Sequence, residues 1–357
     1  MTTVLHTEAS MGWGGQEVRI LTEAQWLLDH GWHVRLAAQP GSGLATRADG
    51  VDLHRVRMRS AWDPFALAGL MRLMRREQIA LVHTHSSTDS WLATLAARLM
   101  GLPVVRSRHV SIPIARRRAL IYHLADRIIA SGEAVAQVVR AAGIPAAKIV
   151  SIPAGVDMTR FHPGVSGKAL RDELGLSGPV AGIVAMLRSS KGHGVFLDAA
   201  REVWHAAPDT RFLIVGDGIG YEHIRGRIRE LGLEHVVIMT GFRRDIPEVM
   251  AALDVLVLPS IKSEATSQVI PQALAVGTPV VGTAMGGIPE IVRDWETGRL
   301  VPPGNPDALA EAILSLLRDP ARARAMAQAG QALVKARYTI ETMMARTIRV
   351  YEELLHQ

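Results

Sequence analysis

The feature that most constrains the fold is a repeated alternation of short, β-branched apolar runs with longer amphipathic segments. Buried parallel strands are continuous apolar runs, and helices connect them along the chain. The pattern therefore predicts an α/β fold with parallel strands and helices on both faces. In the first half the predicted strands are residues 4–6, 34–38, 81–84, 104–107, 127–130 and 149–152, and the predicted helices are 16–30, 90–100, 116–124 and 133–142.

The alternation stops at residues 157–179, where Pro163, Gly164, Gly167 and Gly178 indicate a domain junction. It then restarts, and a chain of 357 residues is long enough for its core to divide. We expect two Rossmann-like domains, 1–160 and 161–338, facing one cleft, with ligands beyond the carboxyl ends of the strands. A helix over 339–357 has one apolar face and is expected to pack back on the first domain. The second set of predicted strands is 180–185, 211–215, 236–240, 255–258 and 280–282.

Composition excludes several classes of protein. The chain has no cysteine, so disulfides and cysteine-ligated zinc are excluded. Its N-terminus does not resemble a signal peptide, and no apolar run approaches the roughly 18 residues of a spanning helix. These features predict a cytoplasmic protein, with association at the inner face of the cytoplasmic membrane left open. A monomer needs no further assumption.

Positive charge is concentrated in the first half. Residues 1–160 carry 19 Lys and Arg against 12 Asp and Glu, whereas the remainder carries 21 against 22. The basic clusters are either solvated faces or a surface for an anionic membrane or phosphorylated lipid. Segment 62–76 is either an interfacial helix or a core helix. Aromatic residues are only 4%, which argues against nucleic acid as a partner. The clusters are Arg55, Arg57 and Arg59, then Arg72, Arg75 and Arg76, then Arg116, Arg117 and Arg118.

Two groups of residues in the first half are candidates for a site. Gly12, Gly14 and Gly15 lie between the first strand and the helix that opens at 16, where backbone amides can bind a phosphate or polar substrate. Ordinary strand-to-helix turns also use glycine. His83 and His85 suggest a metal pair, but no acidic or histidine cluster in the sequence completes it, so no metal site is predicted.

Two segments of the second half carry stronger signals. Arg188 and Lys191 precede a helix, where two cations can hold a diphosphate unless they are ordinary surface charges. Glu264 lies in a polar loop between a strand and a helix, where sugar hydroxyls can be bound. The segment 215–220 lacks the spacing of a dinucleotide fingerprint and is predicted to be a tight turn.

Taken together and in this order along the chain, these motifs resemble those of family 4 of the retaining glycosyltransferases. Members of that family have the GT-B fold of two facing Rossmann-like domains with a deep cleft between them. The resemblance covers nearly the whole chain. It comprises the Gly14-Gly15-Gln16-Glu17 loop, the strand ending at His109, segments 129–131, 152–157, 185–198 and 215–218, and the stretch from Pro259 to Gly304.

The resemblance implies a role for each matching residue. His109 would approach the transferred sugar, with a structural histidine after a strand as the alternative. Arg188 and Lys191 would bind the donor diphosphate, and Glu264 would hydrogen-bond sugar hydroxyls. Gly14 and Gly15 would lie at the acceptor and phosphate side of the cleft. The residues expected to contact the donor are Gly14, Gly15, Gly216, Phe242, Ala265, Thr266, Ser267, Gln268, Val269 and Gln272.

The implied function is metal-independent, retaining transfer of a sugar from a UDP- or GDP-sugar to a saccharide or lipid-linked acceptor, in synthesis of bacterial lipopolysaccharide or cell-surface polysaccharide. No cofactor is expected, since the nucleotide-sugar is a substrate. The family usually has two glutamates eight positions apart, and Gln272 occupies the second position here. An epimerase or hydrolase, a dehydrogenase and a non-catalytic nucleotide-sugar sensor stay open as alternatives.

Overall fold

A computed structural model describes residues 2–356 and divides the chain into two compact units. Unit 1 combines the chain up to Ala154 with the chain from Ile340 onward, and unit 2 is Gly155–Thr339. The predicted junction at 157–179 therefore lies inside unit 2, and the chain passes between units before residue 157 and again at 339–340. The side chains of segment 157–179 explain why it belongs to unit 2, because Phe161 and Leu170 are buried in the core of that unit despite the surrounding prolines and glycines.

Unit 1 is built on a seven-stranded sheet in the order β3-β2-β1-β4-β5-β6-β7. All neighbouring strands in it pair in parallel. The strands are β1 (Thr3–Glu8), β2 (His33–Ala38), β3 (Asp52–Arg55), β4 (Leu81–Thr84), β5 (Val104–Arg108), β6 (Arg127–Ala130) and β7 (Ile149–Ser151). Strand β3 was not predicted, because this short edge strand is mostly polar and only partly buried.

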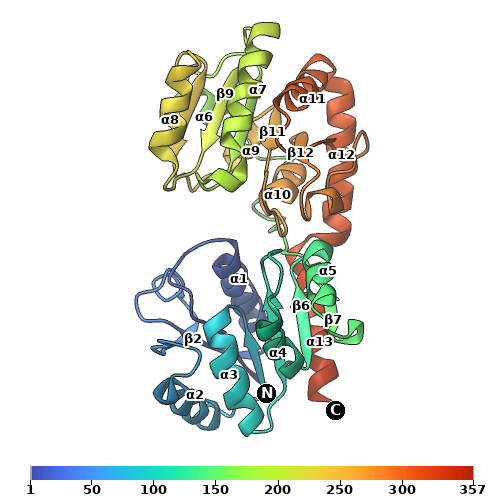
Figure 1. Ribbon diagram of the computed structural model, residues 1–357. Helices are drawn as coiled ribbons and strands as arrows, with labels where there is room; N and C mark the ends of the chain where they lie inside the picture. The colour runs from blue at the N-terminus through green and yellow to red at the C-terminus, as the bar shows by residue number, and fades with distance from the viewer. Residues whose placement is uncertain (1, 357) are drawn as a thin grey trace. The chain divides into compact units, whose positions relative to one another are not determined.

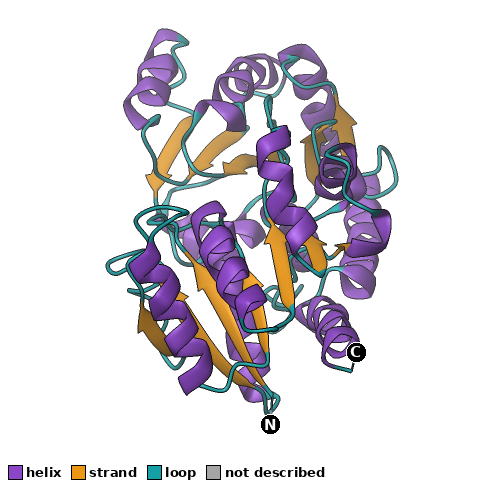
Figure 2. Ribbon diagram, turned by 60° about the horizontal axis from the view of Figure 1, so that its bottom comes forward, coloured by secondary structure: helices purple, strands orange, loops and turns teal. Residues whose placement is uncertain are grey.

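Helices cover both faces of this sheet, and in Figure 2 they flank the orange strands. They are α1 (Gly15–Asp29), α2 (Pro64–Arg76), α3 (Ser87–Leu99), α4 (Arg116–Leu124), α5 (Glu133–Ala141) and α13 (Ile340–Leu355), with a 3-10 turn at Ala146–Lys148. Helix α2 buries Ala66, Leu70, Leu73 and Met74, so its apolar face is largely core. Phe65 nonetheless remains 86% exposed.

Unit 2 has a six-stranded parallel sheet in the order β10-β9-β8-β11-β12-β13. The strands are β8 (Val180–Val184), β9 (Arg211–Val215), β10 (Val237–Gly241), β11 (Val255–Leu258), β12 (Val280–Thr283) and β13 (Arg299–Val301). The helices are α6 (Lys168–Glu173), α7 (His193–Ala206), α8 (Tyr221–Glu230), α9 (Ile246–Ala252), α10 (Val269–Val276), α11 (Pro306–Arg318) and α12 (Pro320–Arg337), with 3-10 turns at Ser189–Lys191 and Ile288–Glu290. The two sheets confirm the predicted α/β class.

The last helix of the chain belongs to the first unit. Figure 1 shows α13 in red beside the green strands and helices of unit 1. Its buried face includes Met343, Met344 and Tyr351, which pack in the same core cluster as Val4 and Ile20. A helix with one apolar face needs such a surface to bury it. Unit 1 is thus completed by two segments that lie at opposite ends of the sequence.

Among the described residues, no helix combines the length and apolar character that crossing a membrane requires.

Candidate functional site

In unit 2, four loops that follow parallel strands meet at the carboxyl end of the sheet. They are 185–192 after β8, 216–220 after β9, 259–268 after β11 and 284–287 after β12. Backbone hydrogen bonds join them, since Ile261 N–H donates to the Ser190 carbonyl at 3.0 Å and Gly287 N–H donates to the Glu264 carbonyl at 3.0 Å. This edge is where sheets of this kind bind ligands. The structure therefore brings together the predicted site residues of two separate segments.

Lys191 and Glu264 form the centre of this arrangement. Lys191 Nζ donates to Glu264 Oε2 at 2.7 Å, and Ser260 Oγ donates to the same oxygen at 2.7 Å. Their side chains are only 14% and 8% exposed, so the ion pair is shielded from bulk water. A shielded carboxylate that accepts two hydrogen bonds has a fixed orientation. The cation predicted to bind a diphosphate thus also positions the carboxylate predicted to bind sugar hydroxyls.

Arg188 lines a pocket of about 430 Å³ within unit 2. The pocket lies at the start of α7 and includes Ile219 and Ile261 from two neighbouring loops. His193, the first residue of α7, also lines it, and burial lowers the pKa of that imidazole to about 4. A neutral imidazole beside a helix N-terminus and an arginine suits a polar, anionic ligand. Sequence reasoning did not single out His193, because one histidine at a helix start carries no pattern.

The residues of unit 2 that were also predicted on the donor side lie in or near these loops, whereas Gly14 and Gly15 lie in unit 1. Ala265, Thr266, Ser267 and Gln268 lead from Glu264 into α10, which begins at Val269, and Gln272 lies half-buried in its first turns. Gly216 forms the predicted tight turn between β9 and α8. Phe242 is 67% exposed just after β10, which is an edge strand of the sheet.

Gly286 packs against the Glu264 loop; it lies within the predicted stretch from Pro259 to Gly304, but no role was predicted for it. Gly286 has a φ of +54°, and a Cβ there would lie 1.7 Å from the Glu264 carbonyl oxygen. No other residue type fits at so short a distance. The next residue, Gly287, packs in the same way against the Ala265 carbonyl. The Gly286-Gly287 pair is visible in the sequence, but its partner loop is not.

In unit 1, the loop after β1 leads into α1 across the predicted glycines. Gly14 is the N-cap of α1 and Gly15 its first residue. A Cβ at Gly12 would meet nothing within 4 Å, and one at Gly14 would meet only a Glu17 oxygen at 3.6 Å. Protein packing therefore leaves space beside this loop, where exposed amides at a helix start can meet a ligand.

Glu8 lies buried at the end of β1, directly beneath this loop. Its carboxylate accepts hydrogen bonds from the Ser10 backbone N–H and from the Gln16 side chain. Burial and the nearby carboxylate of Asp89 raise the pKa of Glu8 to about 7. A carboxyl group with such a pKa exchanges its proton near neutral pH, which only the folded structure makes apparent.

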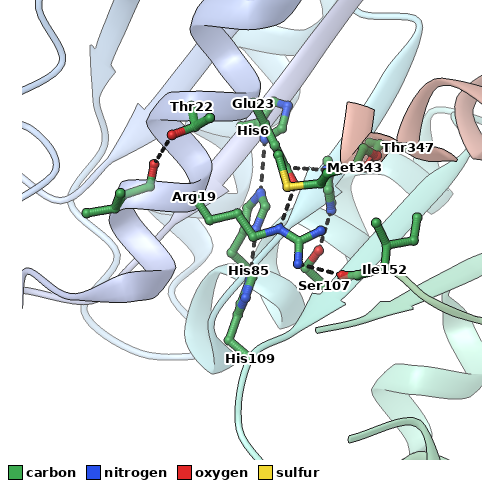
Figure 3. A network of polar contacts seen from close by, with 12 residues as sticks. His6, Arg19, Thr22, Glu23, His85, Ser107, His109, Ile152, Met343 and Thr347 are labelled. Atoms are coloured by element: carbon green, nitrogen blue, oxygen red, sulfur yellow. Dashed lines mark hydrogen bonds and ion pairs between the residues drawn. The ribbon is translucent and has the colours of Figure 1, made fainter. Parts of the chain in front are cut away.

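His109, half-buried after β5, is the outer end of a chain of hydrogen-bonded side chains (Figure 3). His109 Nε2 lies 3.3 Å from His85 Nδ1, and His85 Nε2 lies 3.0 Å from His6 Nδ1. Beyond His6, the Tyr351 hydroxyl lies 3.5 Å from His6 Nε2 and 2.6 Å from His83 Nδ1. His83 Nε2 then reaches Ser107 Oγ at 2.8 Å.

This chain couples the protonation of its histidines. Burial lowers the pKa of His6 to about 3 and holds the pKa values of His83, His85 and His109 well below their usual range. Positive charge on Arg19 adds to the effect for the last three. A neutral imidazole has one donor and one acceptor nitrogen, so the tautomer of one ring constrains the next.

The structure corrects one premise about metal binding. No partner for His83 and His85 is visible in the sequence, whereas in the structure His6 and Glu23 lie with them so that one ligand atom of each falls within 4.8 Å of the others. These residues come from β1, from β4 and the residue after it, and from α1. Spacing along the sequence cannot reveal that they lie close together. All six ring nitrogens of the three histidines already have hydrogen-bond partners, and Glu23 pairs with Arg19 at 2.7 Å. Metal-independent activity therefore stays a prediction.

Comparison with known proteins assigns this architecture. The structure superposes on Anabaena Alr3699/HepE, solved in complex with UDP, with a TM-score of 0.90, 22% identity and coverage of 99% of this chain and 100% of that chain. Two parallel-sheet units of this kind define the GT-B fold, which confirms the predicted fold class.

Family models identify the chain further. The model "Glycosyltransferase Family 4" matches residues 13–160, and "Glycosyl transferases group 1" matches residues 170–333. The chain belongs to the group 1, family 4 type of glycosyltransferases, as the motif order predicted, and it is accordingly a glycosyltransferase.

Two curated relatives agree with this assignment. The 2-deoxystreptamine glucosyltransferase of Streptomyces kanamyceticus is 28% identical over 90% of this chain and 89% of its own length. The D-inositol 3-phosphate glycosyltransferase of Segniliparus rotundus is 32% identical over 71% of this chain and 62% of its own length. Both names describe glycosyltransferases.

Replacing Gly286 with alanine tests the support of the Glu264 loop. We expect Gly286→Ala to lower the free energy of unfolding by several kcal/mol, because the new Cβ would overlap the Glu264 carbonyl. The control is Gly304→Ala, which has a φ of +73° but nothing within 4 Å of the Cβ, and should lose about 1–2 kcal/mol from backbone strain alone. Equal losses in urea unfolding would contradict the contact.

Removing the Tyr351 hydroxyl tests the buried hydrogen-bond network of the histidines. Tyr351→Phe leaves nitrogens of His83 and His6 without a partner, so we expect a loss of about 1–3 kcal/mol in unfolding free energy. Tyr221→Phe, at the half-buried start of α8, removes a hydroxyl outside the histidine network and serves as the control. Comparable losses of unfolding free energy for both variants in urea would show that the histidine network does not stabilise the fold.

The raised pKa of Glu8 predicts a pH-dependent effect of Glu8→Gln. Between its ordinary pKa of 4.5 and about 7, the folded wild type keeps a proton on Glu8 that the unfolded chain releases, so this carboxyl destabilises the fold as pH rises. Glutamine removes that effect. The variant should gain up to about 3 kcal/mol relative to wild type between pH 5 and pH 8. A difference in unfolding free energy that is constant over this range would contradict the prediction.

Proposed function

We propose that the chain transfers a sugar from a UDP- or GDP-sugar to a saccharide or lipid-linked acceptor with retention of configuration, with the donor held by unit 2 and the acceptor by unit 1. The observation that carries the donor assignment is the Lys191–Glu264 pair beside the Arg188 pocket. It places cations for a diphosphate next to a fixed carboxylate for sugar hydroxyls. The relative solved with UDP supports this class of donor.

The chemistry requires charge stabilisation at the departing diphosphate. Arg188, Lys191 and the amides at the start of α7 supply positive charge and hydrogen-bond donors there. No carboxylate in unit 2 is assigned as a nucleophile, since Glu264 is already bonded by Lys191 and Ser260. In the proposed mechanism the donor phosphate takes the acceptor proton on the face from which it leaves.

Acceptor binding is proposed on the surface of unit 1 that carries the Gly12–Gly15 loop and His109. The phosphorylated acceptor in the name of the Segniliparus relative supports a polar, anionic acceptor. The pathway we propose is synthesis of bacterial lipopolysaccharide or cell-surface polysaccharide, as the family resemblance implies. Attraction to an anionic membrane is part of this proposal, supported by the exposed arginines at the start of α4 and by Phe65 and Trp62, which are 86% and 74% exposed.

Nucleotide binding tests the donor site. Thermal unfolding with UDP, GDP, ADP and NAD in parallel should show a higher midpoint with UDP or GDP, because a ligand of the folded state stabilises it. Arg188→Ala should abolish the shift and lower turnover of the matching nucleotide-sugar about a hundredfold, as the loss of one stabilising donor does. The control Arg229→Ala changes an exposed arginine of α8. A shift with NAD alone, or normal turnover in Arg188→Ala, would overturn the proposal.

Metal independence can be measured separately. Because Arg188 and Lys191 supply the positive charge, we expect dialysis against EDTA to leave nucleotide-sugar turnover unchanged. Metal analysis of the purified chain should find no stoichiometric zinc at the His6, Glu23, His83 and His85 cluster. Activity lost on chelation and restored by a divalent ion would assign the metal a role.

A further inference from the structure

A pocket of about 270 Å³ lies within unit 1 beside His109. Three arginines line it, Arg106 from β5, Arg108 from the end of the same strand and Arg118 from α4. No aspartate or glutamate is among its lining residues. Three guanidinium groups around one pocket without a carboxylate make its interior strongly positive.

Arg106 is the buried member of this set. Its side chain is 5% exposed, and its Nε and Nη1 atoms have no hydrogen-bond partner in the described residues. The guanidinium lies over the Tyr122 ring at 4.2 Å, and Nη2 donates to the Tyr122 hydroxyl at 3.3 Å. A buried cation with unused donors is unfavourable unless an anion completes it.

Arg108 approaches the same tyrosine. Its Nη1 donates to the Tyr122 hydroxyl at 2.5 Å, Nη2 donates to the Ile112 carbonyl, and Nε has no partner. None of the ion pairs found among residues 2–356 includes Arg106, Arg108 or Arg118. No ion pair among the described residues therefore neutralises these charges.

The carboxylate that acts on Arg106 is Asp89, which does not complete it. The Asp89 oxygens already accept hydrogen bonds from Thr7, from the His85 backbone N–H and from Ser86. Burial raises the pKa of Asp89, while Arg106 and these hydrogen bonds act in the opposite direction. An anion from outside the chain is the remaining counter-charge.

Part of the pocket lining is apolar. It comprises Trp91, Ile112, Ile114 and Ile121, and Ile112 is 59% exposed. A bare inorganic anion would leave these side chains without a partner, whereas an ester of phosphate with an apolar alcohol would contact both the arginines and the apolar lining. Bidentate arginine contacts suit phosphate oxygens.

We propose that Arg106, Arg108 and Arg118 form a binding site for a phosphate ester, which is the anionic part of the acceptor. The assignment to the acceptor rests on the proposed function, because His109 lines the same pocket. Binding of the ester itself depends only on unit 1 and is measured without sugar transfer.

Calorimetric titration of the full chain with hexyl phosphate, inorganic phosphate and hexanol tests the site. We expect one saturable site that binds hexyl phosphate more tightly than inorganic phosphate and does not bind hexanol. The titration is repeated with Arg188→Ala, whose unit 1 is unchanged, so that phosphate bound by unit 2 is recognised. Absence of saturable hexyl phosphate binding in the wild type would overturn the proposal.

Variants assign the binding to the pocket. Arg106→Lys keeps the charge but loses the forked donors, and Arg108→Gln and Arg118→Gln remove one charge each; we expect each to weaken hexyl phosphate binding, the first two at least about tenfold. Arg117→Gln, an exposed neighbour on α4 that does not line the pocket, is the matched control and should bind normally. Arg118 is exposed, so its variant is informative even if Arg106→Lys folds poorly. Unchanged binding in Arg108→Gln and Arg118→Gln would overturn the site.

Vesicles distinguish the source of the phosphate ester. Phosphatidylcholine vesicles that contain phosphatidic acid should displace hexyl phosphate if the site takes a lipid phosphate, and should leave it bound if the site takes a soluble ester. Pure phosphatidylcholine is the control. Either result keeps the anion site. Hexyl phosphate binding without any nucleotide binding would refute the proposed donor assignment alone, and the reverse result would refute the phosphate site alone.

Discussion

The close approach of backbone to backbone at the carboxyl end of the unit 2 sheet is the constraint on which the candidate donor site depends. Three glycines have carbonyl oxygens within 2.0 Å of the position that a Cβ would occupy. No side chain fits there, so each loop fixes the path of the next. The pairs are Gly192 with Pro259, Gly216 with Ala185, and Gly286 with Glu264. The ion pair of Lys191 and Glu264 is formed on loops that are already held, which preorganises it for a ligand.

Unit 1 achieves order by a different route, through polar groups in its interior. Four histidines and Tyr351 are linked in one chain, and Arg19 is paired with Glu23 beside it. Buried polar networks strengthen a unique structure when satisfied and weaken it when one member is lost. Burial favours the neutral imidazoles but the protonated Glu8, so the two kinds of group respond to pH in opposite directions. The pH dependence of unit 1 is therefore a balance between them.

Much of the fold could be predicted, because strand and helix periodicity are local properties. The predicted strands at 127–130, 211–215 and 255–258 match β6, β9 and β11. Edge strands β3 and β13 were missed, since short, partly exposed strands have weak apolar patterns. The cluster around His83 was missed for another reason, because its members come from β1, β4, α1 and α13 and meet only through tertiary packing. Arg106 likewise looked like one more basic residue until its burial was known.

The placement of α13 has a consequence for the order in which the chain becomes structured. Tyr351 and His6 are in contact although 345 positions separate them in the sequence. All of unit 2 lies in sequence between the two segments of unit 1, the sheet and α13. Unit 2 is continuous in sequence, so it can form its core before α13 joins unit 1. The sheet of unit 1 has its polar interior groups incomplete until α13 packs on it. The closing of that long loop makes completion of unit 1 a late step of folding.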